Sequence, residues 1–195
     1  MCRQPSPWEK CVEFHGHICP GLMIGFKVAT IAMEELQLTK AKDEELIALV
    51  ENQSCAVDAI QVLTGCTFGK GNLFHKDHGK QVYTIANRRT GEALRIAVKP
   101  NLFTVDPQYQ EFKDKVRTTE LSEEENNLFI EKQLATCQQV LELSNEDFCK
   151  VERVSMEFPK TAQIHETLTC HKCGEGVMAP KAQIIEGHPY CVSCA

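Results

Sequence analysis

Hydrophobic residues recur along the chain with the 3.6-residue period of helices and, elsewhere, in the short runs typical of strands. A serine cap, a proline and a capping-box glutamate begin a predicted helix over residues 6–14. Residues 22–38 are apolar around most of the helical circumference, which indicates a helix in the core rather than on the surface. Residues 55–63, 107–117 and 122–143 are also predicted to be helical.

Apolar runs of strand length separate these helices. Strands are predicted at residues 46–50, 81–87, 92–98 and 151–158. Arg88-Arg89-Thr90-Gly91 joins the second and third runs as a hairpin turn, so part of the sheet is antiparallel. The polar residues 74–80 predict a solvated turn. The expected fold class is therefore α+β, with helices packed on an antiparallel or mixed sheet.

The end of the chain carries a motif of a different kind. Cys170-x-x-Cys173 and Cys191-x-x-Cys194 are separated by 17 residues, a spacing typical of a four-cysteine zinc site. Four thiolates leave no open position, so this zinc is expected to be structural. The alternative, two redox-active pairs, lacks the surrounding βαβ pattern that such motifs require. We therefore expect a core domain over residues 1–159 and a small zinc-finger domain over residues 160–195.

Composition and charge narrow the class of molecule that the protein is expected to bind. The net charge of −6 and the pI near 5.7 give no general attraction to nucleic acid, which is the disfavoured partner. The sequence shows neither a long uncharged apolar stretch nor a signal-peptide pattern, so we expect a cytoplasmic protein without a membrane partner. Eleven cysteines in a reducing compartment are more often metal ligands, catalytic groups or buried hydrophobes than disulfides.

The segment FHGHICPG, residues 14–21, concentrates metal-binding side chains. If it is extended, His15, His17 and Cys19 share one face, because side chains two residues apart point the same way. Cys19 also lies beside a predicted helix N-terminus, where the helix dipole lowers a thiol pKa. The alternative is a purely structural role. In that case the segment is a buried turn whose histidines hydrogen-bond to the backbone and whose cysteine packs as a small hydrophobic side chain.

A second cysteine-containing segment follows the first predicted strand. Ser54 is placed to cap a helix that carries Cys55 and Asp58 one turn apart on the same face. The next loop, TGCTFGKGN, contributes Cys66 and Lys70, but it does not match a phosphate-binding P-loop. Metal-site candidates are thus His15, His17, Cys19, Cys55 and Cys66, and catalytic candidates are Cys19, Cys55, Asp58 and Lys70.

With these motifs assembled, the chain resembles the E-subunit family of formylmethanofuran dehydrogenase over about residues 5–100. The resemblance rests on FHGHICPG, on the Cys55-Ala56-Val57-Asp58-Ala59 segment with TGCTFGKGNL, and on Asp77-x-Gly79-Lys80. It implies an α+β core that forms homodimers, a cleft lined by histidine and cysteine, and a C-terminal treble-clef zinc finger in some members. The family name reflects neighbouring genes for molybdenum or tungsten enzymes, and it fixes no reaction.

Two functions remain open at this point. One is a metal-dependent or thiol-dependent protein whose core cleft acts on a small molecule or on metal itself, in metabolism that the resemblance links to molybdenum or tungsten enzymes. In the metal-dependent form the core holds a second transition metal, zinc by default. The other is a regulatory or accessory protein that uses the zinc finger for contact with a protein or, less favoured, a nucleic acid. The segment from Thr161 to Ala195 contains two lysines and three glutamates, so it has no stripe of basic residues that could bind phosphates. Whether the chain is an enzyme is left open.

Overall fold

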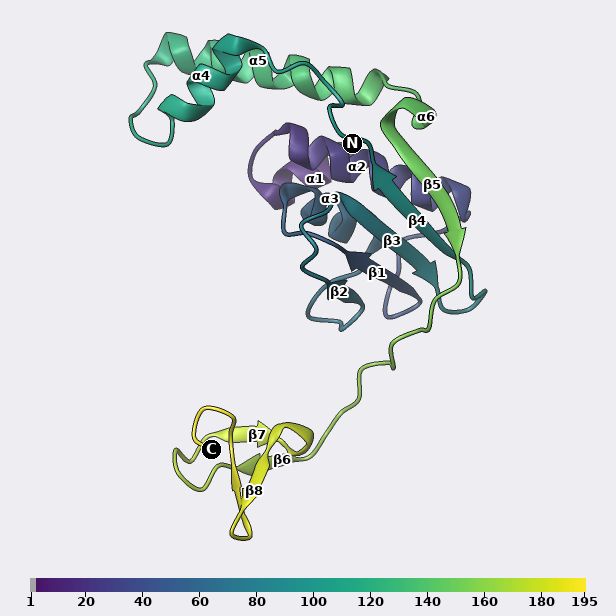
Figure 1. Ribbon diagram of the computed structural model, residues 1–195, viewed down its shortest axis with the longest axis vertical. Coiled ribbons are helices and arrows are strands. Elements are labelled where there is room, and N and C mark those ends of the chain that lie inside the picture. Colours follow the sequence, from purple (N-terminus) through teal and green to yellow (C-terminus); the bar gives the residue numbers. More distant parts are fainter. Residues whose placement is uncertain (1–2) are drawn as a thin grey trace. The chain divides into compact units, whose positions relative to one another are not determined.

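The computed structural model describes residues 3–195, which divide into two compact units, one ending at Pro159 and one comprising Lys160–Ala195 (Figure 1). The described part of the first unit contains six α-helices: α1 (Pro7–His15), α2 (Pro20–Glu35), α3 (Cys55–Thr64), α4 (Pro107–Lys115), α5 (Glu123–Glu142) and α6 (Asn145–Phe148). Its five-stranded sheet comprises β1 (Leu46–Val50), β2 (Leu73–His75), β3 (Val82–Asn87), β4 (Ala93–Val98) and β5 (Cys149–Val154).

The sheet has the strand order β2-β1-β3-β4-β5 and is mixed. β1 pairs with β2 in parallel through the crossover helix α3, whereas β3, β4 and β5 continue from β1 in antiparallel pairs. The predicted α+β class, with helices on a mixed sheet, is confirmed. Because α3 follows β1 directly, its N-terminus lies beyond the carboxyl end of that strand, where α/β sheets commonly place binding sites.

The main core lies between one face of the sheet and the helices α2 and α3. Alternate residues of β3 and β4, including Tyr83, Ile85 and Leu94, pack there against Val28 of α2 and Ile60 of α3, and all five are essentially fully buried. The opposite face of the sheet is covered more thinly. There Met156 and Phe158, in the segment after β5, pack against a small buried cluster of Ile47, Ala86 and Ala93.

Three elements differ from the sequence prediction. β2 was not predicted and overlaps the start of the predicted polar turn. Its three residues, which pair with β1, are too few to show an apolar period. α6 was not predicted. β5 begins at Cys149, before the predicted start at Val151, and ends at Val154 rather than Phe158. Met156 and Phe158, whose alternation with polar residues resembles that of a strand, pack over the sheet instead of extending it.

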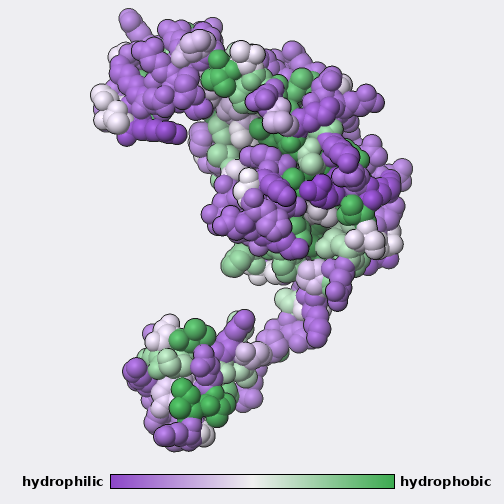
Figure 2. Space-filling view, in the orientation of Figure 1, coloured by the Kyte–Doolittle hydropathy of each residue, from purple (hydrophilic) through white to green (hydrophobic). Residues whose placement is uncertain are grey.

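The second unit is built from short hairpins around the cysteine pairs. Its strands are β6 (Thr167–Thr169), β7 (Gly176–Met178), β8 (Gln183–Ile185) and β9 (His188–Tyr190), and a single 3₁₀ turn spans Ala179–Lys181. β6 pairs with β7 and β8 with β9. Hydrophobic side chains remain on its surface (Figure 2), among them Met178, Ile184 and Val192. Across both units, no helix of residues 3–195 is long and apolar enough to cross a membrane.

Candidate metal centre

Three candidate donors meet where α1 ends and α2 begins. α1 stops at His15 because Gly16 adopts a left-handed φ of 89°, and Cys19 is the N-cap of α2. The ligand atoms of His15, His17 and Cys19 all lie within 4.8 Å of one another; we call these three residues the core cluster. The sequence predicted the same grouping from an extended segment, whereas the structure achieves it with a helix end and a turn.

A carboxylate of α3 orients the first histidine. His15 Nδ1 lies 2.7 Å from Asp58 Oδ2, and His15 Nε2 lies 3.7 Å from Cys19 Sγ. A hydrogen bond donated by Nδ1 leaves the Nε2 lone pair directed at the cysteine side, which is how metal-bound histidines are usually held. The His15 side chain is 11% exposed and that of Asp58 34% exposed, so the pair is partly shielded from water.

Cys55 approaches the core cluster from α3. It is the first residue of that helix, and a Cβ added to Gly21 would meet Cys55 Sγ at 3.6 Å and Cys19 Sγ at 3.9 Å. Gly25, one turn further along α2, passes so close to Ala56 that an added Cβ would lie 2.0 Å from its carbonyl oxygen. The glycines at positions 21 and 25 therefore let α2 and α3 approach closely enough to bring the two cysteines together.

The pKa of the Cys19 thiol is shifted in the direction opposite to the one predicted. Burial raises the pKa of the Cys19 thiol to about 12, and the nearby thiols of Cys55 and Cys137 add to the rise. The N–H of Leu22 donates to Cys19 Sγ at 3.3 Å and acts in the opposite direction. The predicted lowering of this pKa by the helix N-terminus is wrong for the protein alone, because the loss of hydration outweighs one amide hydrogen bond.

Two sequence candidates are not brought to the core cluster. Cys66 follows the C-terminal end of α3, and the ten residues of that helix place it about 15 Å from the end that carries Cys55. Cys66 is fully buried in the main core, and burial raises the pKa of its thiol to about 11. Lys70 Nζ donates instead to the backbone carbonyls of Asp43 (3.1 Å) and Ala41 (3.5 Å). Both residues therefore stabilise the loop after α3.

A polar network behind α3 was not predicted. Ser54 occupies the N-cap position as expected, but its hydroxyl does not cap the helix and donates to Asn52 Oδ1 at 2.7 Å. Asn52 Nδ2 in turn donates to the Tyr83 hydroxyl at 3.2 Å and to the Lys80 carbonyl. This network fixes the turn that delivers Cys55. A β-strand followed by Glu-Asn-Gln-Ser was its one signal in the sequence.

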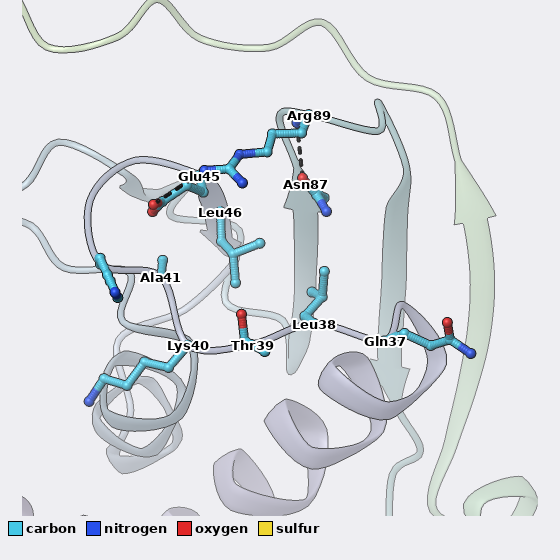
Figure 3. A pocket seen from close by; sticks show the side chains of 10 residues that line it. Gln37, Leu38, Thr39, Lys40, Ala41, Glu45, Leu46, Asn87 and Arg89 are labelled. Atoms are coloured by element: carbon cyan, nitrogen blue, oxygen red, sulfur yellow. Dashed lines mark hydrogen bonds and ion pairs between the residues drawn. The ribbon is translucent and has the colours of Figure 1, made fainter.

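A polar hollow of about 340 Å³ lies at the far end of α2 (Figure 3). Arg89 spans part of it, with its guanidinium 3.7 Å from Glu45 and its backbone N–H donating to Asn87 Oδ1. Figure 3 shows the Lys40 side chain directed away from this pair. Because α2 has 16 residues and is about 24 Å long, this hollow is remote from the core cluster and shares no residue with it.

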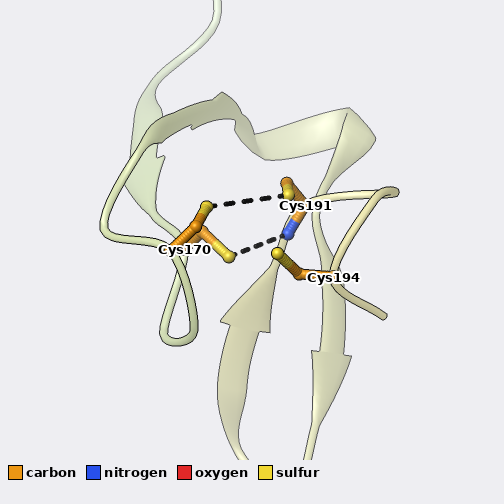
Figure 4. Close-up of side chains that lie close together, drawn as sticks. Cys170, Cys191 and Cys194 are labelled. Atoms are coloured by element: carbon orange, nitrogen blue, oxygen red, sulfur yellow. Dashed lines mark hydrogen bonds between the residues drawn. The ribbon is translucent and has the colours of Figure 1, made fainter.

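In the second unit the four predicted cysteines do converge. Cys170, Cys173, Cys191 and Cys194 form one group with sulfur atoms within 4.8 Å of one another. Figure 4 shows Cys170, Cys191 and Cys194 turned toward a common centre, with the N–H of Cys191 donating to Cys170 Sγ at 3.3 Å. Amide hydrogen bonds from Cys173 and Cys191 lower the pKa of Cys170 to about 6, which favours the thiolate that zinc requires.

The neighbouring histidines take no part in this group. His171 and His188 stack on each other with ring centroids 4.2 Å apart, and Tyr190 meets His171 edge-on. Four thiolates without a further ligand make a closed structural zinc site.

Each of the two units matches a known protein family. The profile described as "FmdE, Molybdenum formylmethanofuran dehydrogenase operon" matches residues 14–150, and that of the prokaryotic dksA/traR C4-type zinc finger matches residues 165–195. The second match identifies the C-terminal unit as a four-cysteine zinc finger, which supports a structural zinc ion there.

Two individual proteins are similar over nearly the whole chain. A "Probable S-adenosyl-L-methionine-binding protein" of Archaeoglobus fulgidus is 35% identical over 192 residues, which are 94% of this chain and 50% of that protein. The chain thus spans about half the length of this curated relative. A crystal structure of a tungsten formylmethanofuran dehydrogenase FmdE-like protein from Syntrophus aciditrophicus matches with a TM-score of 0.59 and 26% identity, covering 95% of this chain and 88% of that one. The chain belongs to the FmdE family.

Proposed function

We propose that the first unit binds a second transition metal ion at the core cluster and uses it to bind a small molecule. The observation that carries this proposal is the alignment of Asp58, His15 and Cys19, in which the carboxylate holds the imidazole with Nε2 3.7 Å from the sulfur. Donors on one tetrahedral zinc, with bonds of about 2.0–2.3 Å, lie about 3.5 Å apart. The existing separation therefore fits a shared ion closely.

The donor set also indicates the kind of metal. Imidazole and thiolate suit zinc, iron, nickel or copper and are poor ligands for magnesium or calcium, so zinc is the default. His15, His17 and Cys19 supply three donors. Cys55 lies outside this group of ligand atoms but its sulfur approaches Gly21 as that of Cys19 does, so the fourth position is open to a ligand or to Cys55 after its side chain moves. A metal with an open position would supply Lewis acidity to a bound molecule. Asp58 would hold His15 in the ligating tautomer.

Metal content of the full chain tests this proposal. Anaerobically zinc-loaded protein should hold one ion in the finger and one in the core, counted by inductively coupled plasma mass spectrometry. Asp58→Asn should weaken core binding by about 10- to 100-fold, since it removes the carboxylate behind the metal-bound imidazole. His17→Ala should release the core ion, whereas the exposed His75→Ala serves as the matched control. If loaded parent protein holds only the finger's zinc, the core centre is wrong.

The identity of the small molecule is a further proposal. The relative from Archaeoglobus fulgidus is named as a probable S-adenosyl-L-methionine-binding protein and is 35% identical over 94% of this chain. S-adenosyl-L-methionine is therefore the first ligand to titrate, with and without metal in the core. Calorimetry that detects no heat of binding in either state would remove it from consideration.

A regulatory role for the zinc finger is the second candidate function. Met178, Ile184 and Val192 are 59–66% exposed on this unit, and exposed apolar side chains are typical of protein contacts. The net charge of this segment, with two lysines against three glutamates after Thr161, favours a protein over a nucleic acid. A salt-dependent shift of labelled DNA by the full chain would reverse that preference.

Assembly and compartment also remain proposals. We expect a homodimer because the chain belongs to a family for which the sequence resemblance implies one, and because Phe68 is 83% and Phe14 59% exposed. Large exposed aromatic side chains favour an interface. Sedimentation velocity at micromolar concentration would contradict this if it gave a monomer.

A cytoplasmic location fits the ten described cysteines, all with free thiols, since metal-binding thiols need a reducing environment; Cys2 lies outside the described residues.

A further inference from the structure

An apolar groove separates α2 from α5 next to the core cluster. Trp8, Met23 and Phe26 line one side, and Leu134, Cys137 and Leu141 of α5 line the other. Its volume of about 560 Å³ is that of a pocket for a small molecule, since such pockets enclose about 300–1,000 Å³. Gln138 adds one amide to this lining, which otherwise consists mainly of aliphatic and aromatic groups.

The groove adjoins residues that surround the proposed metal centre. Ile18, which also lines it, is the residue between His17 and Cys19. Trp8 and Phe26 contact each other edge-on at 5.3 Å and pack against the buried group that contains Cys19. Trp8 and Phe26 are therefore shared between the groove wall and the surroundings of Cys19.

We propose that the α2–α5 groove holds the apolar body of a small molecule whose metal-binding head reaches the core cluster. This inference rests on the proposed core metal. Leu134 and Leu141 line the groove and are each 45% exposed, so an apolar body there would remove hydrophobic surface from water. A molecule that had only the metal-binding head would bind the metal and leave the groove empty. Contacts between the apolar body and the groove therefore select which molecules bind.

Two hydroxamates on the zinc-loaded full chain test the proposal. Acetohydroxamate carries only the metal-binding head, whereas phenylbutyryl hydroxamate adds an apolar body. Both report on the core, because the four thiolates of the finger leave its zinc no open position. Calorimetry gives the affinities, and Trp8, the only tryptophan of the sequence, gives a fluorescence signal from the groove wall. We expect the phenylbutyryl compound to bind at least about tenfold more tightly and to change the Trp8 emission.

Helix α5 offers a matched pair of variants. Leu134→Glu places a charge in the groove, and Ile130→Glu places it one turn earlier, on a residue that is 44% exposed and lies outside the groove lining. Leu134→Glu should abolish the advantage of the phenylbutyryl compound and leave acetohydroxamate binding unchanged. Ile130→Glu should behave like the parent for both probes.

Three outcomes would overturn the inference. Equal affinity of the parent for the two probes, or equal losses in the two variants, would show that the groove takes no ligand. If Leu134→Glu instead converted a dimer to a monomer in sedimentation while both probes bound equally, the groove would be an interface between two copies of the chain. If neither probe bound and metal analysis found only the finger's zinc, the core metal centre would fail, and the groove proposal would fail with it.

Discussion

At the scale of single residues, Gly25 is the described glycine that leaves the least room for an added side chain. Its α-carbon faces the backbone of Ala56, and an added methyl group would lie 2.0 Å from the carbonyl oxygen and 2.5 Å from the α-carbon. No side-chain rotation relieves a clash with backbone, so α2 would have to move away from α3. We expect Gly25→Ala to lower the free energy of unfolding by about 3 kcal/mol or more, measured by urea denaturation.

Gly69→Ala provides the control for that substitution. The added methyl group at Gly69 meets nothing within 4 Å, so the variant should stay within about 0.5 kcal/mol of the parent. A Gly25→Ala protein as stable as Gly69→Ala would mean that the two helices are not held together as tightly as described.

The candidate site was predictable in part at this scale. His15, His17 and Cys19 are five residues or fewer apart, so local spacing sufficed to group them. The bond between His15 and Asp58 joins positions 43 residues apart, which no local pattern reveals. The expectation that Cys66 is nearby failed for the same reason. It depended on how the chain runs through α3, and the helix carries Cys66 away from Cys55.

At the scale of elements, a buried lysine fixes the long helix α5 to the core. Lys27 of α2 is 7% exposed, and its ammonium donates to the carbonyls of Val140 (3.1 Å), Leu141 (2.9 Å) and Leu143 at the C-terminal end of α5. These carbonyls have no partner within the helix, so the lysine satisfies acceptors that burial would otherwise leave unpaired.

We expect Lys27→Met to lower the free energy of unfolding by about 1–3 kcal/mol and to speed amide hydrogen exchange in the last turns of α5. Methionine keeps most of the side-chain volume and removes the donor. Lys10→Met, on the exposed surface of α1, is the matched control and should leave both measurements unchanged. Equal exchange rates in the Lys27→Met and parent helices would contradict the role assigned to the lysine.

Elements with a strong period were predictable from the sequence, and those formed by pairing alone were not. β1 was predicted at Leu46–Val50 and lies there, because a bounded apolar run of this length is too short for a buried helix. β2 has three residues, and its partly exposed side chains show no alternation; it exists because β1 offers it a parallel edge. The role of Lys27 was equally hidden, since a single charged residue in an apolar helix gives no indication of its partner.

At the scale of the whole molecule, the two units should respond separately to loss of the finger's zinc. The second unit comprises 36 residues, Lys160–Ala195, and shows one fully or nearly buried apolar residue, Cys170, among those described. Such a segment depends on its metal for folding free energy. We expect Cys173→Ser to release that zinc and to make residues beyond Pro159 sensitive to trypsin, while the first unit keeps its thermal transition.

Cys149→Ser, a thiol of the first unit outside both cysteine groups, is the control and should keep the finger's zinc and its protease resistance. Intact zinc content in the Cys173→Ser protein, with an unchanged digestion pattern, would refute the four-thiolate site.

The order of the donors along the chain has a consequence for biosynthesis. All residues of the proposed core centre, from His15 to Asp58, precede β3 and β4, whereas the four cysteines of the finger are the last ligands to be made. Because a nascent chain emerges from the ribosome in sequence order, the core donors are available to a metal ion while most of the sheet is still untranslated. The donors of the two centres would thus be complete at different times during synthesis, those of the core before those of the finger.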